Sequence, residues 1–545
     1  MGFLRNILLA LGALALAEIG WGERVRVPLA VPALFLLPYA LLGLAELLGR
    51  RGRWRLSAAA AAALPWSAPA AQLGAVLLGW CAAVEDVLGA PPGFASWPGP
   101  ELLIGLLPYA CVEVAAIDAR ARLGDRRPEV RAALRAFQLR MLVSALAPLV
   151  LFIGAASAVA WHPTARAWIE EVALANGLFA AGLLLGFGLV LPSLLRNTWD
   201  TAPLGPGWQS DVIARTAQQA GFRCKEIRVW HTSNLMANAA VIGFLPQHRV
   251  VLFSDALLQE LGPAELAAVF AHEIGHAQRR HVWIFAAYAL GFFLLADVAL
   301  SWLALDSLAL ELGLFAALML LWYLSFGYLS RRFELDADLH SVATTGDLNG
   351  LIRALEQVGG VHAREQGSWR HFSVAQRVGF LAADARDPRV GRALRRRLRR
   401  WAVVGVLLFA AGIGGEVSRL ARSLPSDRVV VDLRLGRYAA AAERAEGAGV
   451  DARLQAAVDA ARGVSPEVPP ADLVARALAR LEAGDARGAL ALVDLAGLRN
   501  GDPPDGVLPA LEARVEGAGE PALDAAEAVG DAAWREALLA RAEGA

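Results

Sequence analysis

Residues 272–276 read His-Glu-Ile-Gly-His, and this stretch decides how the rest of the chain is interpreted. On a helix, His272 and His276 lie one turn apart on the same face, so both imidazoles can reach one Zn²⁺ ion at about 2.0–2.1 Å. Glu273 is rotated by roughly 100° from His272, which places its carboxylate beside the metal and outside the ligand set. Two histidine ligands with an adjacent base are typical of a metallohydrolase.

A catalytic zinc ion needs a third protein ligand, and the residues that follow His276 do not supply a histidine at metzincin spacing. Carboxylates occur instead in the string 333–338, Phe-Glu-Leu-Asp-Ala-Asp. Glu334 and Asp338 share one helix face, and we expect Glu334 to be the third ligand. Asp338 is expected to accept the second N–H of a zinc-bound histidine and so fix its tautomer. The alternative is a solvated acidic segment that follows Arg331-Arg332.

Composition indicates a membrane protein. The chain has 545 residues, of which 56% are hydrophobic and 19% are charged, whereas soluble domains carry about 25% charge. A formal net charge of 0 argues against nucleic acid as a partner. Cys81, Cys111 and Cys224 are too widely spaced to predict a disulfide framework or a cysteine-based zinc site.

Apolar stretches that approach the length of a bilayer span recur along the chain. They lie near residues 3–21, 27–48, 68–88, 102–117, 142–160, 173–195, 282–303, 308–329 and 402–413. Arginines cluster in 50–55 and 120–140, while 89–100 has none, so the positive-inside rule places the His272–His276 segment in the cytoplasm. The near absence of lysine suggests a bacterial source, and therefore an inner membrane protein. The first stretch has a signal peptide as its alternative.

The residues that precede the motif have the composition of a soluble domain. Residues 210–220 are expected to form a helix, and 227–230 and 249–253 are expected to form short strands, with a third run at 238–244 between them. Gly262-Pro263 then starts the helix that carries the motif, because proline is favoured at a first helical turn.

This arrangement resembles peptidase family M48, the zinc metallopeptidases that include the Ste24 and HtpX types. The resemblance rests on Asn238-Ala239, on 254–258, on 264–276 and on the Glu334–Asp338 string after a pair of spans, and it covers roughly residues 200–385. It implies a membrane-embedded zinc metalloendopeptidase with one Zn²⁺ per chain, a zinc-activated water and Glu273 as general base. The substrate would be polypeptide, cleaved in membrane-protein quality control or processing.

The resemblance also implies roles for three further residues. His371 and Arg377 match a histidine and an arginine six residues apart, which implies transition-state stabilisation and substrate binding, although Phe372 stands where the family usually has proline. An ion pair that only holds a helix is the alternative for Arg377. Asn238 matches an Asn-Ala pair on an edge strand that would pair with an extended substrate; a simple turn is its alternative.

The expected fold is mainly α: a polytopic transmembrane bundle, a gluzincin-type protease domain with a small β-sheet, and an α-helical C-terminal domain. The expected boundaries are 1–195 for an N-terminal region of about six spans, 196–400 for the M48-like domain with a hairpin near 282–329, 401–424 for a last span and linker, and 425–545 for the tail. The tail faintly resembles tetratricopeptide repeats, which favours a protein-docking surface and a plain helical bundle equally. If the last stretch spans the membrane, the tail lies outside the cytoplasm.

Two other functions are left open. The first is a non-catalytic membrane scaffold or transporter with a degenerate or structural metal site. The second is an intramembrane site-2-type protease, whose motif would lie inside an apolar span. Gln278, Arg279 and Arg280 flank the motif and fit the second poorly.

Overall fold

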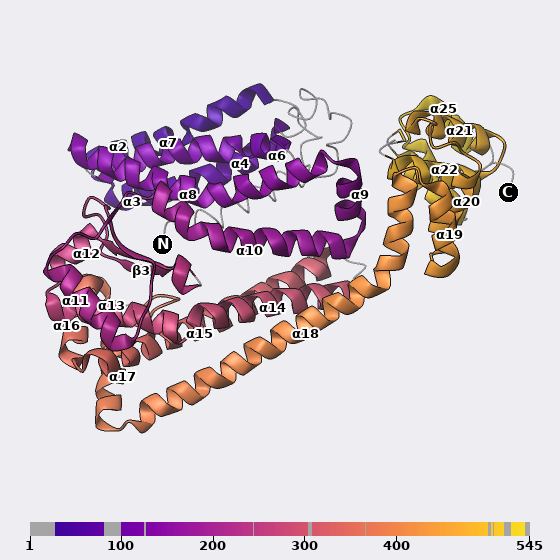
Figure 1. The fold of residues 1–545 in the computed structure, drawn as a ribbon. Coiled ribbons are helices and arrows are strands. Elements are labelled where there is room, and N and C mark those ends of the chain that lie inside the picture. The colour runs from indigo at the N-terminus through magenta and orange to yellow at the C-terminus, as the bar shows by residue number, and fades with distance from the viewer. Residues whose placement is uncertain are drawn as a thin grey trace.

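The computed structural model describes residue 13 and residues 28–80, 100–124, 127–243, 245–303, 308–363, 365, 367–499, 503–504, 506–516 and 525–539. These residues are mainly helical and contain one four-stranded sheet (Figure 1). The mainly α fold expected from the sequence is thus confirmed.

Six helical segments in the described part are long and apolar enough to cross a membrane. They are Val31–Arg50, Pro128–Val159, Ala173–Thr198, His281–Leu300, Gly313–Thr345 and Arg389–Arg434. A spanning helix pairs its backbone N–H and C=O groups within the helix, because the hydrocarbon core of a bilayer offers them no water. The chain is an integral, multi-pass membrane protein.

The spans expected before residue 195 are only partly present among these six. The stretch 3–21 lies outside the described residues except for Ala13. The stretch 68–88 is described only up to residue 80, and its described part contains most of helix α4 (Ser67–Leu77). The stretch 102–117 falls on α6 (Pro100–Gly105) and α7 (Leu107–Gly124). Helix α7 is not a candidate span because it carries two acidic residues and two arginines.

The remaining N-terminal elements form a helical bundle. They are η2 (Pro28–Leu36), α2 (Leu37–Arg50), α3 (Trp54–Ala63), η3 (Leu64–Trp66), α8 (Pro128–Ala160), α9 (Pro163–Glu171) and α10 (Ala173–Thr198). Polar groups inside this bundle are paired: the Arg120 guanidinium donates to buried Glu113 at 2.7 Å, and the Gln72 amide donates to the Gly105 carbonyl oxygen at 3.0 Å. The pairing explains how Glu113 is tolerated at this depth.

The sheet has the order β1-β2-β4-β3. Its strands are β1 (Thr201–Pro203), β2 (Glu226–Trp230), β3 (Ala239–Ile242) and β4 (Val250–Ser254), where β2 and β4 are parallel and the other two pairs are antiparallel. Strand β1 was not expected, since three residues that end in proline give no strand signal. Strand β3 forms one edge of the sheet that the described residues make.

Helices α11 (Trp208–Ala220), α12 (Asp255–Glu260) and α13 (Pro263–Gln278) pack with this sheet. Leu266, Phe270 and Ile274 recur every four residues on α13 and are fully buried in one core with Phe253 of β4. This apolar face fixes the rotation of α13. The motif residues of α13 are therefore held in a set direction, away from the sheet.

The helices that follow are longer than the apolar stretches that they contain. They are α14 (His281–Leu303), α15 (Leu308–Thr345), α16 (Leu348–Ala363), α17 (Val374–Arg386) and α18 (Arg389–Arg434). Helix α15 has 38 residues and carries both a membrane span and the 333–338 string, and α18 has 46 residues with the 402–413 stretch in its middle. At about 1.5 Å per residue, α18 is roughly 70 Å long, more than twice the thickness of a hydrocarbon core.

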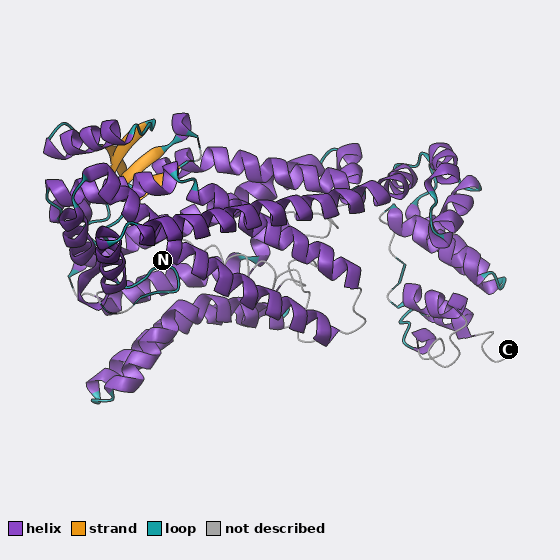
Figure 2. Ribbon diagram, turned by 90° about the horizontal axis from the view of Figure 1, so that it is seen from below, coloured by secondary structure: helices purple, strands orange, loops and turns teal. Residues whose placement is uncertain are grey.

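The tail is a separate helical domain built on the end of α18. Its helices are α19 (Tyr438–Ala448), α20 (Ala452–Arg462), α21 (Pro470–Glu482), α22 (Ala486–Leu498), α23 (Val507–Glu516) and α25 (Ala532–Leu539). Val429 and Leu433 of α18 belong to the tail's core, so the last turns of α18 pack as part of the tail. Figures 1 and 2 place this domain at the opposite end of the long helices from the sheet.

Candidate metal centre

The site lies where α13 crosses α15. A Cβ atom on Gly275 would meet the Ala337 Cα at 3.1 Å and the His340 Cβ at 3.0 Å, so the glycine inside the motif permits the close approach of the two helices. The Ser341 hydroxyl donates to the Ala268 carbonyl oxygen at 2.7 Å and joins the helices again one turn away. The expected ligands are therefore brought together by helix packing and do not depend on loops.

His272, His276 and Glu334 point their polar atoms at one another, and one ligand atom from each lies within 4.8 Å of the others. The two Nε2 atoms are 3.2 Å apart, and the Glu334 carboxylate lies 3.7 Å from His272 Nε2 and 3.6 Å from His276 Nε2. Ligands that each lie about 2.1 Å from a tetrahedral zinc ion are about 3.4 Å apart. The spacing and the two-nitrogen, one-carboxylate donor set therefore fit a catalytic zinc ion.

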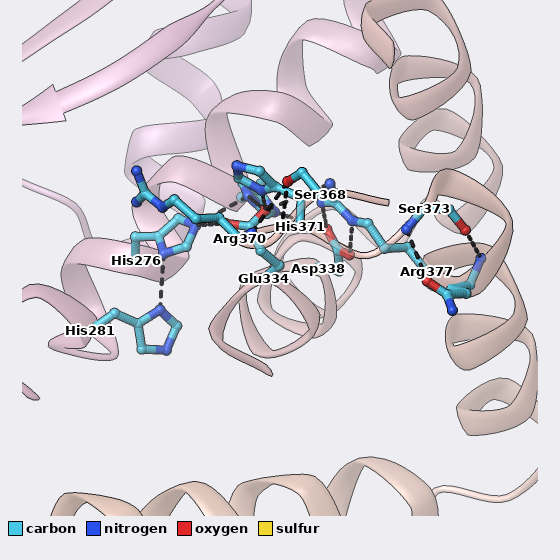
Figure 3. Close-up of polar contacts among 11 residues, drawn as sticks. His276, His281, Glu334, Asp338, Ser368, Arg370, His371, Ser373 and Arg377 are labelled. Carbon is cyan, nitrogen blue, oxygen red and sulfur yellow. Dashed lines mark hydrogen bonds and ion pairs between the residues drawn. The ribbon is translucent and has the colours of Figure 1, made fainter. Parts of the chain in front are cut away.

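Asp338 lies directly behind His272. Its Oδ1 atom is 2.9 Å from His272 Nδ1, and its side chain is fully buried. Arg377 of α17 donates to the same carboxylate from Nε at 2.8 Å and from Nη2 at 2.5 Å (Figure 3). Asp338 thus orients one candidate ligand, while Arg377 holds Asp338 in a two-bond, charge-assisted geometry.

His371 and Arg377 also reach Glu334. His371 Nδ1 lies 3.2 Å from Glu334 Oε2, and Arg377 Nη1 lies 3.6 Å from the same oxygen (Figure 3). The side chain of His371 is 50% exposed, in contrast to the buried Arg377. A turn in which the His371 N–H donates to Ser368 Oγ at 3.0 Å presents the ring to the site, and the Ser373 cap starts α17 just after it.

Trp369 anchors this turn on the membrane helix. Its indole N–H donates to the Tyr323 carbonyl oxygen at 2.9 Å, and its ring stacks on that of Tyr323 with centroids 4.4 Å apart. Gly327 makes room, because a Cβ there would collide with the indole nitrogen of Trp369. Phe372, in the place of the usual proline, lies under the guanidinium of Arg331 at 5.6 Å.

Glu273 stands beside the candidate ligands with no hydrogen bond among the described side chains. Burial raises the pKa of its carboxyl to about 7, and the charge of Glu334 adds to this rise. Burial and the neighbouring His272 lower the pKa of His276 to about 3, so this ring is neutral at physiological pH. A neutral ring is what metal ligation needs, and a carboxyl group that titrates near neutrality suits a general base.

The pKa of His272 moves in the opposite direction. Burial acts to lower it, but the hydrogen bond and the negative charge of Asp338 outweigh burial and raise the pKa of the ring. Arg377 shows the same pattern, because the charge of Asp338 outweighs burial and raises the pKa of the guanidinium. Negative charge therefore collects on the α15 side of the site, where a cation would be favoured.

Asn238 is not part of this cluster. It directly precedes β3, its N–H donates to Ser254 Oγ at 2.8 Å, and its carbonyl oxygen accepts from the Ser254 N–H at 2.9 Å. Its side chain is exposed. The structure thus places Asn238 at the start of the edge strand, and β3 packs beside α13, which carries the motif.

Two residues that sequence reasoning did not select complete the surroundings of His276. His281 Nδ1 lies 3.0 Å from His276 Nδ1, and His281 Nε2 lies 3.2 Å from Asp336 Oδ2. Both residues are buried. The sequence did contain a signal for both. The chain has only 9 histidines, yet His281 follows the motif by five residues, and Asp336 lies between Glu334 and Asp338.

Comparisons with known proteins agree with this site. Residues 204–395 match the family model of peptidase family M48. A protease HtpX homolog of Chlorobium phaeobacteroides is 26% identical over 236 residues, which cover 36% of this chain and 75% of the relative. Protease HtpX of Salmonella arizonae is 32% identical over 113 residues, which cover 18% of this chain and 38% of the relative.

Among solved structures, the crystal structure of S. mikatae Ste24p superposes with a TM-score of 0.42 at 15% sequence identity, over 68% of this chain and 98% of that one. The family match spans strands β2, β3 and β4 and the elements that build the site, α13 and the carboxylates of α15. Through residues 204–395, this chain is similar to peptidase family M48.

Proposed function

We propose that this protein is a zinc-dependent endopeptidase of the membrane that hydrolyses peptide bonds of protein substrates. The observation that carries the proposal is the convergence of His272, His276 and Glu334 on one point with a carboxylate, Glu273, beside it. One zinc ion per chain, held by these three side chains, would polarise the scissile carbonyl and acidify water.

Glu273 is the proposed general base. It would accept the proton of the attacking water and deliver it to the leaving amine, and a pKa near neutrality allows both transfers. His371 is the proposed donor to the developing oxyanion, because its half-exposed ring faces the open side of the site. Arg377 would act on substrate indirectly, since its guanidinium is already bound to Asp338.

The edge strand supplies a means of holding the substrate. An extended peptide that adds to β3 would run beside α13, and Asn238 at the start of the strand would bind its backbone. A binding mode of this kind takes main-chain hydrogen bonds and tolerates varied side chains. It therefore suits a protease with broad specificity in membrane-protein quality control or processing.

The proposed location of the site is the cytoplasmic side of a bacterial inner membrane. Six arginines between residues 392 and 400 lie at the start of α18, at the same end of the helices as the site, and the positive-inside rule assigns that end to the cytoplasm. Helix α13 is not among the candidate spans of the described residues, which speaks against a site-2-type protease.

The test is cleavage of an unfolded, casein-like protein by the detergent-purified chain. We expect cleavage by the wild type, its loss on treatment with a zinc chelator, and its return when zinc is added back. Glu273→Gln should fail to cleave under all three conditions, whereas Glu260→Gln, at the exposed end of α12, should cleave like the wild type. Cleavage that survives in Glu273→Gln would contradict the proposal, and an inactive protein that binds no zinc would favour the scaffold.

A further inference from the structure

The two candidate histidine ligands are oriented in different ways. His272 contacts a carboxylate directly, through Nδ1 and Asp338 at 2.9 Å. Among the described residues, no carboxylate contacts the Nδ1 atom of His276, which meets the Nδ1 atom of His281 at 3.0 Å instead (Figure 3). A carboxylate, that of Asp336, comes only one step later, 3.2 Å from His281 Nε2.

The positions of the protons decide which atom donates and which accepts in each hydrogen bond from His276 through His281 to Asp336. His276 offers Nε2 to the metal site, so a neutral His276 ring carries its proton on Nδ1 and donates it. The acceptor is His281 Nδ1, which must then be unprotonated, so the His281 proton is on Nε2. That N–H donates to Asp336, which ends the chain on a negative charge. The direction of each bond is fixed because an ionised carboxylate can only accept.

His281 is built into this position at a cost. Arg280, just before it, adopts a left-handed backbone conformation with φ 59°, which is unfavourable for a residue other than glycine. This turn between α13 and α14 aims His281 back at His276. The ring is 2% exposed and stacks on Phe333 with centroids 4.1 Å apart and planes 14° from parallel. Strain of this kind persists where the surrounding packing and a function retain it.

We propose that His281 is a positioning residue, which together with Asp336 holds His276 in the tautomer that leaves Nε2 free for a metal ion. The proposal rests on the proposed function in that His276 is taken as a ligand. It assigns the second histidine of the motif an orienting pair, His281 and Asp336, whereas the first histidine contacts a carboxylate, that of Asp338, directly. Groups that orient metal-ligating histidines change metal affinity by about 10–100-fold.

The experiment compares His281→Phe with His281→Gln in zinc competition against a chelator. Phenylalanine keeps the stacking on Phe333 but can neither accept nor donate, whereas the glutamine amide can accept from His276 and donate to Asp336. We expect zinc affinity to fall about 10–100-fold in His281→Phe and to be largely restored in His281→Gln. A packing role predicts the reverse order, so wild-type affinity in His281→Phe would overturn the proposal.

A second variant and a second measurement distinguish a folding defect, failure of the proposed function and failure of this inference. If His281→Phe does not fold, Asp336→Leu replaces it because leucine cannot accept from His281, with the same expected loss of affinity and with wild-type affinity as the contradicting result. Ring ¹⁵N chemical shifts of the metal-free protein test the tautomer without zinc: the proton of His276 should be on Nδ1 in the wild type and should redistribute in His281→Phe. Wild-type protein that binds no zinc would refute the proposed function, while a His276 proton on Nε2 would refute this inference.

Discussion

At the scale of single residues, nearly every polar side chain of the site contacts an identified neighbouring side chain. Glu273 is the exception, since it has no hydrogen bond among the described side chains and its pKa is raised to about 7 by burial. A carboxylate left unpaired at this position is free to take a proton from water. The two candidate histidine ligands, by contrast, are contacted from behind by Asp338 and by His281.

We therefore expect Glu273→Gln to abolish proton transfer without loss of metal. Removing a general base typically lowers kcat by about 10²–10⁴-fold, and glutamine is close in shape to glutamate. The measurement is kcat for an unfolded protein substrate together with the zinc content of the same sample. A large loss of zinc in this variant would instead make Glu273 a ligand and contradict its assignment.

Asp338 is expected to be the residue of the site on which folding depends most. Its loss would leave the guanidinium of Arg377 buried without its partner, and breaking a buried pair in this way costs about 3–5 kcal/mol. Asp338→Ala should therefore lower the free energy of unfolding of the metal-free protein more than Asp338→Asn does. The matched double variant Asp338→Leu with Arg377→Met should recover part of the loss; an additive loss would contradict the pairing.

A carboxylate outside the site predicts a pH dependence. The pKa of Asp255 is lowered, because hydrogen bonds from Thr232, Ala256 and Asn234 outweigh the effect of burial. A depressed pKa means that its contribution to stability is present at neutral pH and is lost as the pH falls below about 4 through the folded-state pKa. The stability difference between wild type and Asp255→Asn should shrink over that range. A difference that is constant with pH would contradict the assignment.

At the scale of elements, α14 and α18 are packed against each other through glycines. A Cβ on Gly412 would lie 2.8 Å from the Leu294 Cβ, and one on Gly291 would collide with the Phe409 backbone nitrogen. Close backbone approach of this kind drives helix association in membranes, where apolar surface alone gives no net force. Helix α18 is thereby fixed along the helix that directly follows the motif.

Gly412 and Gly414 offer a matched comparison on the same helix. A Cβ on Gly414 meets nothing within 4 Å, so Gly414→Ala should be neutral or stabilising through helix propensity. Gly412→Ala should lower stability by about 1–3 kcal/mol, the usual cost of overpacking. Thermal unfolding of both variants in one detergent measures the difference. Equal melting temperatures would show that α14 and α18 do not pack as described.

The elements also mark where sequence reasoning succeeds. The helix of the motif, the strands near 227–230 and 249–253 and the carboxylates of α15 follow from local patterns, and the structure brings His272, His276 and Glu334 together as the spacing indicates. Strand β1 could not be predicted because three residues are too few to show a periodic pattern. The length of α18 could not be predicted because its apolar stretch is flanked by polar segments that continue the same helix. His281 was missed because its contact with His276 depends on one left-handed residue, Arg280.

At the scale of the whole molecule, one helix joins the two ends. Helix α18 begins beside α17 at the site, runs along α14 and ends inside the tail's core (Figure 1). Near its far end, Arg434 pairs with Glu170 and Glu171 of α9, the short helix between the spans α8 and α10. The tail is thus attached at the end of the membrane region that is remote from the metal centre.

This arrangement predicts that the site and the tail lie on opposite sides of the membrane. On a background without native cysteines, Glu260→Cys reports on the site end and Arg487→Cys reports on the tail. A membrane-impermeant maleimide should label the tail cysteine in right-side-out vesicles and the site cysteine in inside-out vesicles. Labelling of both in the same vesicles would place the tail and the site on one side and would contradict the path of α18.

The central claim is that three side chains from α13 and α15 hold one zinc ion. Its most direct test is the zinc content per chain of detergent-purified protein, determined by elemental analysis for the wild type, Glu334→Ala and the exposed control Glu260→Ala. We predict one zinc ion per chain in the wild type and in the control, and a large loss in Glu334→Ala. Wild-type protein without zinc under chelator-free conditions, or full zinc content in Glu334→Ala, would contradict the account.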